Sequence, residues 1–377
     1  MSSQFPDAAL SSVGSSKDTR SLAFRNVVRT PAELETLEAA WSSLATKTGI
    51  PMEQYAWMRA CTETLLPSKS LRVAVAAQND VPIAIMPLYV SRVSGRLEIP
   101  GARELGEPFD AIYSDPDAAA KLAEAVVRLR APICLQRMDA NSPFLAALEQ
   151  ALKGRAVTFK RPAPSYPFIP LHEGWKDPES QLTSRRRSDL RRSARHAEKI
   201  GRLRFEMLSP TADELQAVLD CAFETEAKSW KGATGSALAL NQRVGSFFRN
   251  FAKAACDKRQ LRVSFLRIGD RVAAMQIAVE LGGRYWLLKM GYDHEFSKSS
   301  PGMLLIAETV RESAERGLQS YELLGTIEPW THVWTESERP CVSLYAYPLR
   351  PGGLADLATD ATLYVWNRTK TRFKSKK

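Results

Sequence analysis

The feature that most limits how this chain can fold is an internal repeat. Leu71-Arg72-Val73 recurs as Leu261-Arg262-Val263, 190 residues further on. At the same offset, Asp80 corresponds to Asp270 in the turn that follows each strand-like run. Because these matches keep one order and one phase, they predict a fold that is used twice.

Hydrophobic spacing around the repeat predicts helices that alternate with short strands. The expected helices cover residues 31–47, 53–65, 117–130 and 143–153 of the first half. The expected strands of this half cover residues 71–77, 81–90, 95–99, 133–138 and 156–159. The proline-rich segment 161–170 is interpreted as a linker. This pattern is typical of an α+β, or mixed α/β, protein.

The length and these boundaries predict four regions. We expect a disordered lead over residues 1–20, a first half over 21–165, a second half over 166–350, and a C-terminal helix with a basic tail over 351–377.

Composition narrows the class of protein. The net charge of +10 favours an anionic partner. The longest apolar run, residues 81–90, is about half of a bilayer span, so no transmembrane segment is expected. The five cysteines form no CxxC pair and the four histidines have no metal-ligand spacing. We therefore expect free thiols in a reducing cytoplasm and no metal site.

One loop of the second half is a candidate phosphate site. A strand-like run over residues 284–292 is followed by Ser299-Ser300-Pro301-Gly302 and then by a strongly apolar helix. A helix N-terminus presents backbone N–H groups to an anion, and Gly302 adds no side chain that would obstruct a ligand. Ser-Pro-Gly is also an ordinary way to begin a helix, so the spacing alone leaves both readings open.

The residues around this loop resemble a known family. Asp293, Phe296, Ser300-Pro301-Gly302 and Leu304-Leu305, followed by Tyr321–Gly325, resemble the GNAT acyltransferase superfamily. The nearest resemblance is to its CelD-like branch, which is related to FemAB-type transferases with two GNAT-like halves. The basic helix at 185–199 and Trp230-Lys231-Gly232 also resemble that branch, and the match extends over about residues 181–334.

The resemblance implies tandem duplicated GNAT-like domains that use acetyl-CoA or another acyl-CoA. It implies that backbone amides of Met290, Gly291 and Tyr292 hold the pantetheine. It also implies that the pyrophosphate lies on the amides at the start of the helix, and the residues concerned are Ser299, Ser300, Gly302, Met303 and Leu304.

Direct acyl transfer needs a group that takes a proton from the acceptor. Glu322, on an expected strand, and Glu328, after the next turn, are the candidate bases. For Glu322 the alternative is exposure to solvent or pairing with an arginine. Glu328 is followed by Pro329-Trp330-Thr331, where the branch often has a Tyr-Lys pair, so no role of that lysine is carried over.

Other side chains are candidate substrate contacts. Trp330 and Trp334 are interpreted either as a stacking wall for a sugar or as ordinary packing. Asp293 and Asp110 are weaker candidates, and Asp110 becomes relevant only if the first half closes over the site.

The sequence therefore predicts an acyl-CoA-dependent acyltransferase, of the GNAT N-acetyltransferase type, acting on an amine or hydroxyl acceptor. The resemblance favours an amino sugar or an envelope or exopolysaccharide acceptor. One alternative is FemAB-type aminoacyl transfer from charged tRNA, although no RNA-binding pattern supports nucleic acid. A second alternative is a non-catalytic protein that binds anions or nucleic acid on the same scaffold.

Overall fold

The computed structural model of the chain describes residues 28–67, 70–229 and 238–374. The segment 1–20 and Trp230-Lys231-Gly232, to which the sequence analysis assigns roles, lie outside these residues.

The α-helices are α1 (Pro31–Glu35), α2 (Glu38–Ala45), α3 (Tyr55–Thr64), α4 (Pro116–Val127), α5 (Pro143–Leu152), α6 (Pro178–Gln181), α7 (Ser184–Ile200), α8 (Ala212–Ala227), α10 (Gln242–Asp257), α11 (Pro301–Glu315) and α12 (Pro351–Lys374). The strands are β1 (Ala74–Gln78), β2 (Val81–Met86), β3 (Tyr89–Val90), β4 (Leu97–Glu98), β5 (Ile112–Tyr113), β6 (Ile133–Asp139), β7 (Ala156–Pro170), β8 (Leu203–Leu208), β9 (Leu261–Ile268), β10 (Arg271–Leu281), β11 (Arg284–Tyr292), β12 (Ser320–Glu322) and β13 (Glu338–Pro348). Short 3₁₀ turns include η1 (Pro51–Glu53) and η3 (His294–Ser299).

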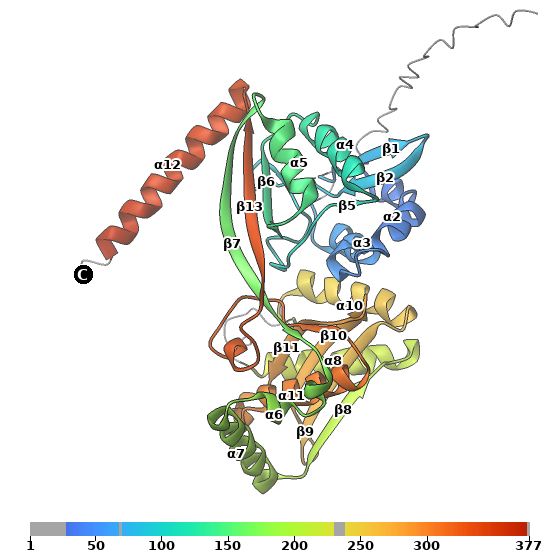
Figure 1. The fold of residues 1–377 in the computed structure, drawn as a ribbon, viewed down its shortest axis with the longest axis vertical. Helices are drawn as coiled ribbons and strands as arrows, with labels where there is room; N and C mark the ends of the chain where they lie inside the picture. The colour runs from blue at the N-terminus through green and yellow to red at the C-terminus, as the bar shows by residue number, and fades with distance from the viewer. Residues whose placement is uncertain (1–27, 68–69, 230–237, 375–377) are drawn as a thin grey trace, which may run out of the picture.

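One ten-stranded sheet runs through both halves of the molecule. Its strand order is β3-β4-β6-β13-β7-β12-β11-β10-β9-β8. Figure 1 shows the first half above and the second half below, with the long strands β7 and β13 running between them. Each half contains one parallel pair, β4 with β6 and β11 with β12. The two halves thus share this element of sheet topology.

The proline-rich segment 161–170 is not a linker, as the sequence analysis expected, but the second part of β7. Residues 156–167 of this strand pair with β13, and residues 168–170 pair with β12. Pro162 and Pro164 thus lie where β7 has a ladder partner on one side. Proline is tolerated there because its missing N–H can face the unpaired edge.

Strand β13 lies between β6 and β7 in the sheet of the first half. Val342 pairs with Met138 on one side and with Pro162 on the other. A segment that follows the second half in sequence therefore completes the sheet of the first.

The two strand hairpins at the repeated residues, β1–β2 and β9–β10, lie in different sheets. β9 and β10 belong to the large sheet, whereas β1 and β2 pair with β5 in a separate three-stranded sheet. The run 81–90, expected to be one strand, is divided into β2 and β3. Pro87 lies in this break, and a proline has no N–H to donate to a ladder.

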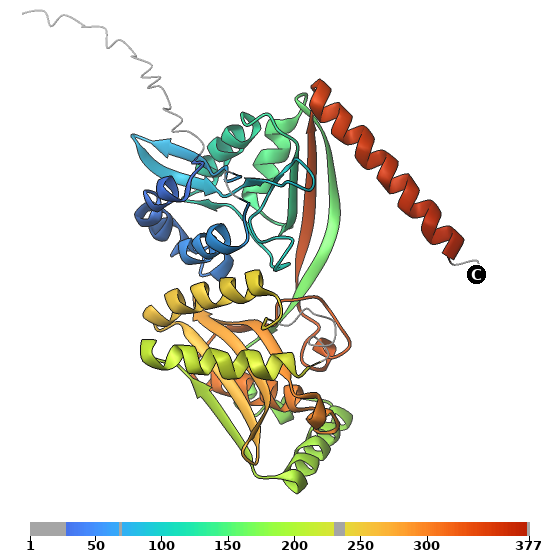
Figure 2. The same cartoon turned by 180° about the vertical axis from the view of Figure 1, so that it is seen from behind.

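Helices cover both faces of the second-half sheet. In Figure 2, α8 and α10 lie across the near face of this sheet. A separate core cluster includes Ile306 and Val310 of α11 together with Leu190 and Ala197 of α7. Between the halves, Trp57 of α3 makes edge contacts with the rings of Phe247 and Phe251 of α10, at 4.8 and 4.9 Å. The halves thus share an apolar interface rather than a flexible hinge.

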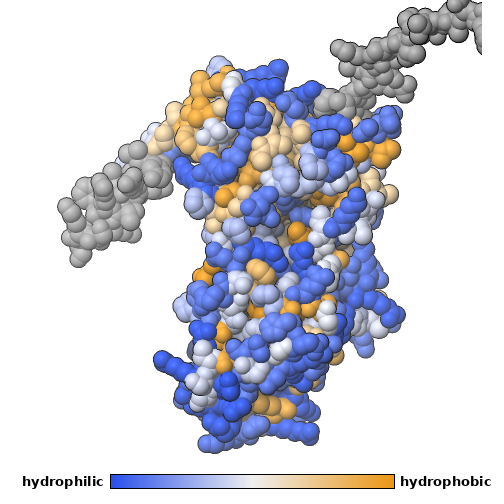
Figure 3. Space-filling view, viewed as in Figure 1, coloured by the Kyte–Doolittle hydropathy of each residue, from blue (hydrophilic) through white to orange (hydrophobic). Residues whose placement is uncertain are grey.

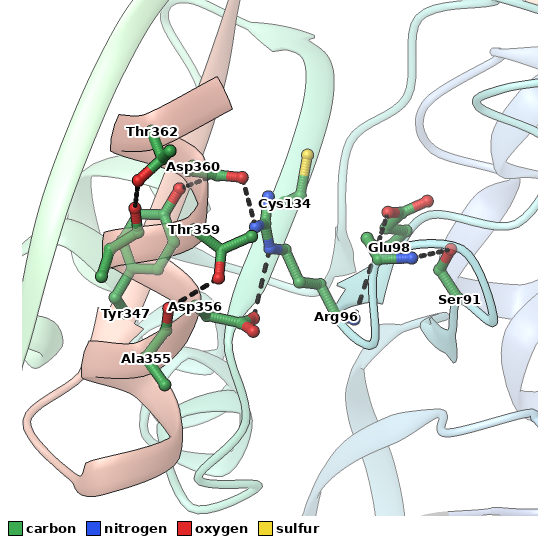
Figure 4. A network of polar contacts seen from close by, with 12 residues as sticks. Ser91, Arg96, Glu98, Cys134, Tyr347, Ala355, Asp356, Thr359, Asp360 and Thr362 are labelled. Carbon is green, nitrogen blue, oxygen red and sulfur yellow. Dashed lines mark hydrogen bonds and ion pairs between the residues drawn. The ribbon is translucent and has the colours of Figure 1, made fainter. Parts of the chain in front are cut away.

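Helix α12 begins after β13 and projects from the first half (Figure 1). Its first turns are held by Arg96, which bonds Asp356 at 3.4 Å and Asp360 at 2.6 Å, as Figure 4 shows. The Tyr347 hydroxyl donates to Asp360 as well. Figure 3 shows apolar residues in small separate groups on a mostly hydrophilic face, one of them where α12 begins.

Among the described helices, none is both long and apolar enough to cross a membrane. All five cysteines are free thiols, and four of them are buried. Within the described residues, no cluster of His, Cys, Asp and Glu could hold a metal ion.

Candidate active site

The parallel strands β11 and β12 diverge, and a cavity opens where they do. Their pairing runs from Arg284–Ser320 to Trp286–Glu322 and ends there. Beyond this point a cavity of ≈ 580 Å³ is lined by residues 287–292 of β11 on one side and by Leu323 and Gly325 on the other. The edge of β11 that β12 leaves can therefore offer its backbone to an extended ligand.

A bulge accompanies this divergence. Ile277 of β10 pairs with Lys289, whereas the next residue, Ala278, pairs with Leu287. Leu288 is thus the extra residue of β11. A bulge bends a strand away from its neighbours and re-aims the groups that follow it.

The start of α11 forms the floor of the cavity. Ser300 precedes it in the left-handed region, at φ 44° and ψ 52°, and its side chain makes no capping bond. The amides of Met303 and Leu304 donate to the Ser300 carbonyl at 3.0 and 3.3 Å, and Pro301 has no N–H. Gly302, at the second helical position, has no carbonyl four residues earlier in the helix to bond. The turn therefore offers fewer amides to an anion than the sequence suggested.

Gly302 is buried but has room for a side-chain carbon. A Cβ built on this residue would meet no atom closer than Sδ of Met290, at 3.8 Å. Gly291 is different, because a Cβ there would lie 2.8 Å from Cγ of Glu226 in α8. Gly291 is thus required by packing, whereas Gly302 leaves room beside the helix terminus.

Six of the eight residues expected to bind the cofactor line the cavity. They are Met290, Gly291, Tyr292, Ser300, Gly302 and Met303. Ser299 is buried instead, and its hydroxyl lies 2.8 Å from Nδ1 of His196 in α7. Leu304 is buried in the core beneath α11.

The candidate base Glu322 is buried and forms an ion pair. Arg339 donates to both of its carboxylate oxygens, at 2.9 and 2.6 Å, and Ser320 donates a further bond of 2.7 Å. A carboxylate with these partners has little capacity left for a substrate, so its geometry favours a role in joining β12 to β13.

The candidate base Glu328 lies on the cavity wall and is exposed. Its carboxylate accepts a bond of 3.0 Å from Nε1 of Trp330, which lines the same cavity. Trp334 is buried in the core and does not line the cavity. Asp293 is buried, caps η3, and bonds Arg271 at 2.9 Å. Its contacts are those of a residue that shapes the loop.

The first half also contributes to the cavity, but not through Asp110. Asp110 lies in a smaller cavity of ≈ 70 Å³ with Glu53 and Asp139, and accepts a bond of 2.8 Å from Ser142. Burial raises the pKa of Asp110 to about 7. Leu105 and Glu107 of the same loop are the residues that line the large cavity.

Sequence reasoning missed Glu107, Leu105 and Lys289. The sequence analysis considered Asp110, which follows Glu107 by three residues in the same loop. Which carboxylate faces the second half depends on the backbone path of that loop. The sequence does not predict this path, because the loop has no helical or strand periodicity.

Residues 184–332 match the sequence model described as the acetyltransferase (GNAT) domain. No curated protein sequence is significantly similar to the chain.

Solved structures resemble the chain over most of its length. The C-terminal domain of a candidate lysylphosphatidylglycerol synthetase from Agrobacterium fabrum has a TM-score of 0.55 and 12% identity, covering 89% of this chain and 97% of that one. FemX has a TM-score of 0.53 and 11% identity, covering 84% and 96%. A conserved protein of unknown function from Bacteroides thetaiotaomicron has a TM-score of 0.51 and 12% identity, covering 86% and 99%.

Residues 184–332 thus match the GNAT acetyltransferase domain, and the chain has a two-half GNAT-like fold. The predicted α+β architecture with two GNAT-like halves is confirmed. Membership of the CelD-like branch stays a prediction.

Proposed function

We propose that the protein is an acyl-CoA-dependent acyltransferase that moves an acyl group, most simply acetyl, directly to an amine or hydroxyl acceptor. The observation that carries this proposal is the divergence of β11 and β12 above the start of α11. It combines an open strand edge and a helix N-terminus in one cavity.

The residues present fit such a co-substrate. A cavity of ≈ 580 Å³ suits the acyl and pantetheine portion, and its apolar wall includes Leu288, Met290 and Met303. Ser300, Gly302 and Met303 line this cavity, so a phosphate in it would lie beside the N-terminus of α11. Helix α7, with six arginines, lies beside the same loop through the contact of His196 with Ser299. Its cations favour the approach of an anion.

Each part of the site has a distinct task in this proposal. The β11 edge at Gly291 and Tyr292 orients the bound molecule, and the Gly302 amide together with the helix dipole stabilises its phosphates. A thioester supplies an activated acyl group. The protein needs to exclude water, polarise the carbonyl through a backbone N–H, and accept a proton from the acceptor. Trp330 and Glu328 at the rim would contact that acceptor.

The acceptor class is a finer part of the proposal. We infer an amine or hydroxyl of an amino sugar or an envelope or exopolysaccharide, because of the CelD-like resemblance and the aromatic rim at Trp330. The five free cysteines fit the reducing cytoplasm that we infer for the protein.

The test is the melting temperature of the full chain with acetyl-CoA and, separately, with free CoA. A ligand that binds the folded state raises it according to its concentration over Kd. We expect a concentration-dependent rise with acetyl-CoA. No rise with any acyl-CoA would overturn the proposal.

A second candidate is aminoacyl transfer from charged tRNA, which the FemAB-type resemblance implies. The net charge of +10 and the fold shared with FemX favour it. Its signature is tight tRNA binding that weakens steeply with salt, without any response to acyl-CoA. Filter binding over a range of salt concentrations, run beside the melting assay, separates the two functions.

A further inference from the structure

The large cavity of the second half is closed on one side by a loop of the first half. This loop runs from β4 to β5, and it brings Leu105 and Glu107 to the cavity wall. Lys289 of β11 and Glu328 line the same cavity. Glu107 is therefore a carboxylate that one half supplies to the cavity of the other.

Arg137 of β6 fixes this loop in place. Its guanidinium donates to the Gly106 carbonyl, to the Gly325 carbonyl at 2.7 Å and to the Pro164 carbonyl at 3.1 Å. Gly106 precedes Glu107, and Gly325 lines the cavity at the end of β12. One side chain thus connects the loop of the first half to the rim of the second-half site.

The carboxylate of Glu107 is held in an unusual state. Its Oε2 is buried and has no hydrogen-bond partner within the described part of the chain. Burial raises the pKa of Glu107 to about 7, and the charges of Lys289 and Arg137 oppose part of that rise. A buried carboxylate oxygen without a partner costs folding free energy unless a ligand uses it.

We propose that Glu107 is the proton acceptor of the acyl transfer and that the acceptor substrate is a protonated amine, which this carboxylate binds and deprotonates. This inference rests on the proposed function. An ammonium group supplies the donors that Oε2 lacks, and the apolar neighbours Leu105 and Leu288 suit the carbon atoms that carry it.

The reaction balances with these groups alone. Glu107 takes one proton from the ammonium group and later releases it to solvent. The neutral nitrogen forms a bond to the acyl carbon as the carbon–sulfur bond breaks. The sulfur leaves with the electron pair of that bond and takes the second proton from the nitrogen, which gives an amide, a free thiol and one released proton.

Glu107 fits this task better than Glu328. Glu328 is exposed and already accepts a bond from Trp330, so solvent and Trp330 compete with a substrate for its carboxylate. A base works best when its pKa lies near the working pH, which burial achieves for Glu107.

The test compares Glu107→Gln with Glu104→Gln and Glu328→Gln. Glu104 lies in the same loop, pairs with Arg243 at 3.8 Å and does not line the cavity, so it is the matched control. Thiol release from acetyl-CoA is followed against pH, with water and with methylamine as probe acceptors. We expect Glu107→Gln to lower turnover by about 100-fold or more and to remove the rise of turnover through pH 7. The acetyl-CoA melting shift is expected to remain.

A second measurement does not depend on the acceptor. In protein carrying ¹³C-labelled Glu carboxyl groups, one resonance is expected to titrate near pH 7 and to be missing in Glu107→Gln. Titration of that resonance at the ordinary value of glutamate would overturn the assignment. So would full turnover of Glu107→Gln beside an inactive Glu328→Gln. Absence of any acetyl-CoA melting shift in the wild type would instead refute the proposed function itself.

Discussion

The corresponding helices α4 and α11 of the two halves both begin with proline, but the residues that follow in their first turns differ. In sequence, α4 lies between the parallel strands β4 and β6, and α11 lies between the parallel strands β11 and β12. In α4 the cap Asp115 accepts a bond of 2.9 Å from the Ala118 amide, and the second position holds Asp117. In α11 the corresponding second position is Gly302. One helix start carries its own anions, whereas the other has no acidic side chain in its first turn and borders the large cavity.

The loops that precede these helices also differ, in length and in what they contact. In the second half the loop is a compact 3₁₀ turn that ends against α7. In the first half it is longer and extends to the cavity of the other half through Glu107. The large cavity is therefore lined by the helix start of one half and by the loop of the other, and neither half forms it alone.

The largest expected effect comes from making α11 start like α4. Gly302→Asp introduces the carboxylate that α4 carries at this position. We expect the acetyl-CoA melting shift to disappear, with affinity falling at least about 100-fold because of charge repulsion and lost space. Asp117→Gly, the reverse exchange in the first half, is expected to leave the shift unchanged. A retained shift in Gly302→Asp would show that the phosphates do not lie at this helix.

The next largest effect is expected from replacing Arg137, whose side chain connects the loop of the first half to the second half. Arg137→Met removes three bonds to carbonyl groups and is expected to lower the free energy of unfolding by about 2–4 kcal/mol. Because Arg137 lowers the pKa of Glu107, the glutamate resonance that titrates near neutrality is expected to move to higher pH. The exposed Arg92→Met is the control. A melting change without any movement of that resonance would mean that Arg137 only stabilises the fold.

The smallest expected effect concerns Asp110, the carboxylate of the first half that does not line the large cavity. Since burial raises the pKa of Asp110 to about 7, the folded state holds its proton over a pH range in which the unfolded state has lost it. The stabilisation is present at low pH and is lost as pH rises from the ordinary aspartate value through about 7. Glu53, whose pKa is also raised, and Asp139 and Arg339 line the same small cavity.

Asp110→Asn keeps the oxygen that accepts from Ser142 and removes the titration. We expect the variant to be more stable than the wild type at pH 8 by on the order of 1 kcal/mol, and to show no gain at pH 4. Urea unfolding at the two pH values measures this. Asp117→Asn, an exposed carboxylate, is expected to follow the wild type. Equal curves for Asp110→Asn and the wild type would show that Asp110 ionises normally.

The sequence predicted what local pattern determines. The repeat around Leu71 and Leu261 predicted the two-half fold, and the strand, turn and apolar helix around Gly302 predicted a phosphate site, where the structure has a cavity. The backbone path of segments that lack helical or strand periodicity could not be predicted. Residues 161–170 read as a linker because proline breaks most strands, yet an edge with one partner accepts it. Glu107 was missed because its importance depends on contacts between the halves.

The position of β13 has a consequence for how the chain is made. Its pairing with β6 and β7 joins segments that are far apart in sequence, so the first half emerges from the ribosome long before the strand that completes its sheet. Until then, β6 and β7 present open edges to other chains. We expect folding in the cell to be completed only when translation is nearly finished, and a nascent chain stalled before residue 338 to depend on chaperones.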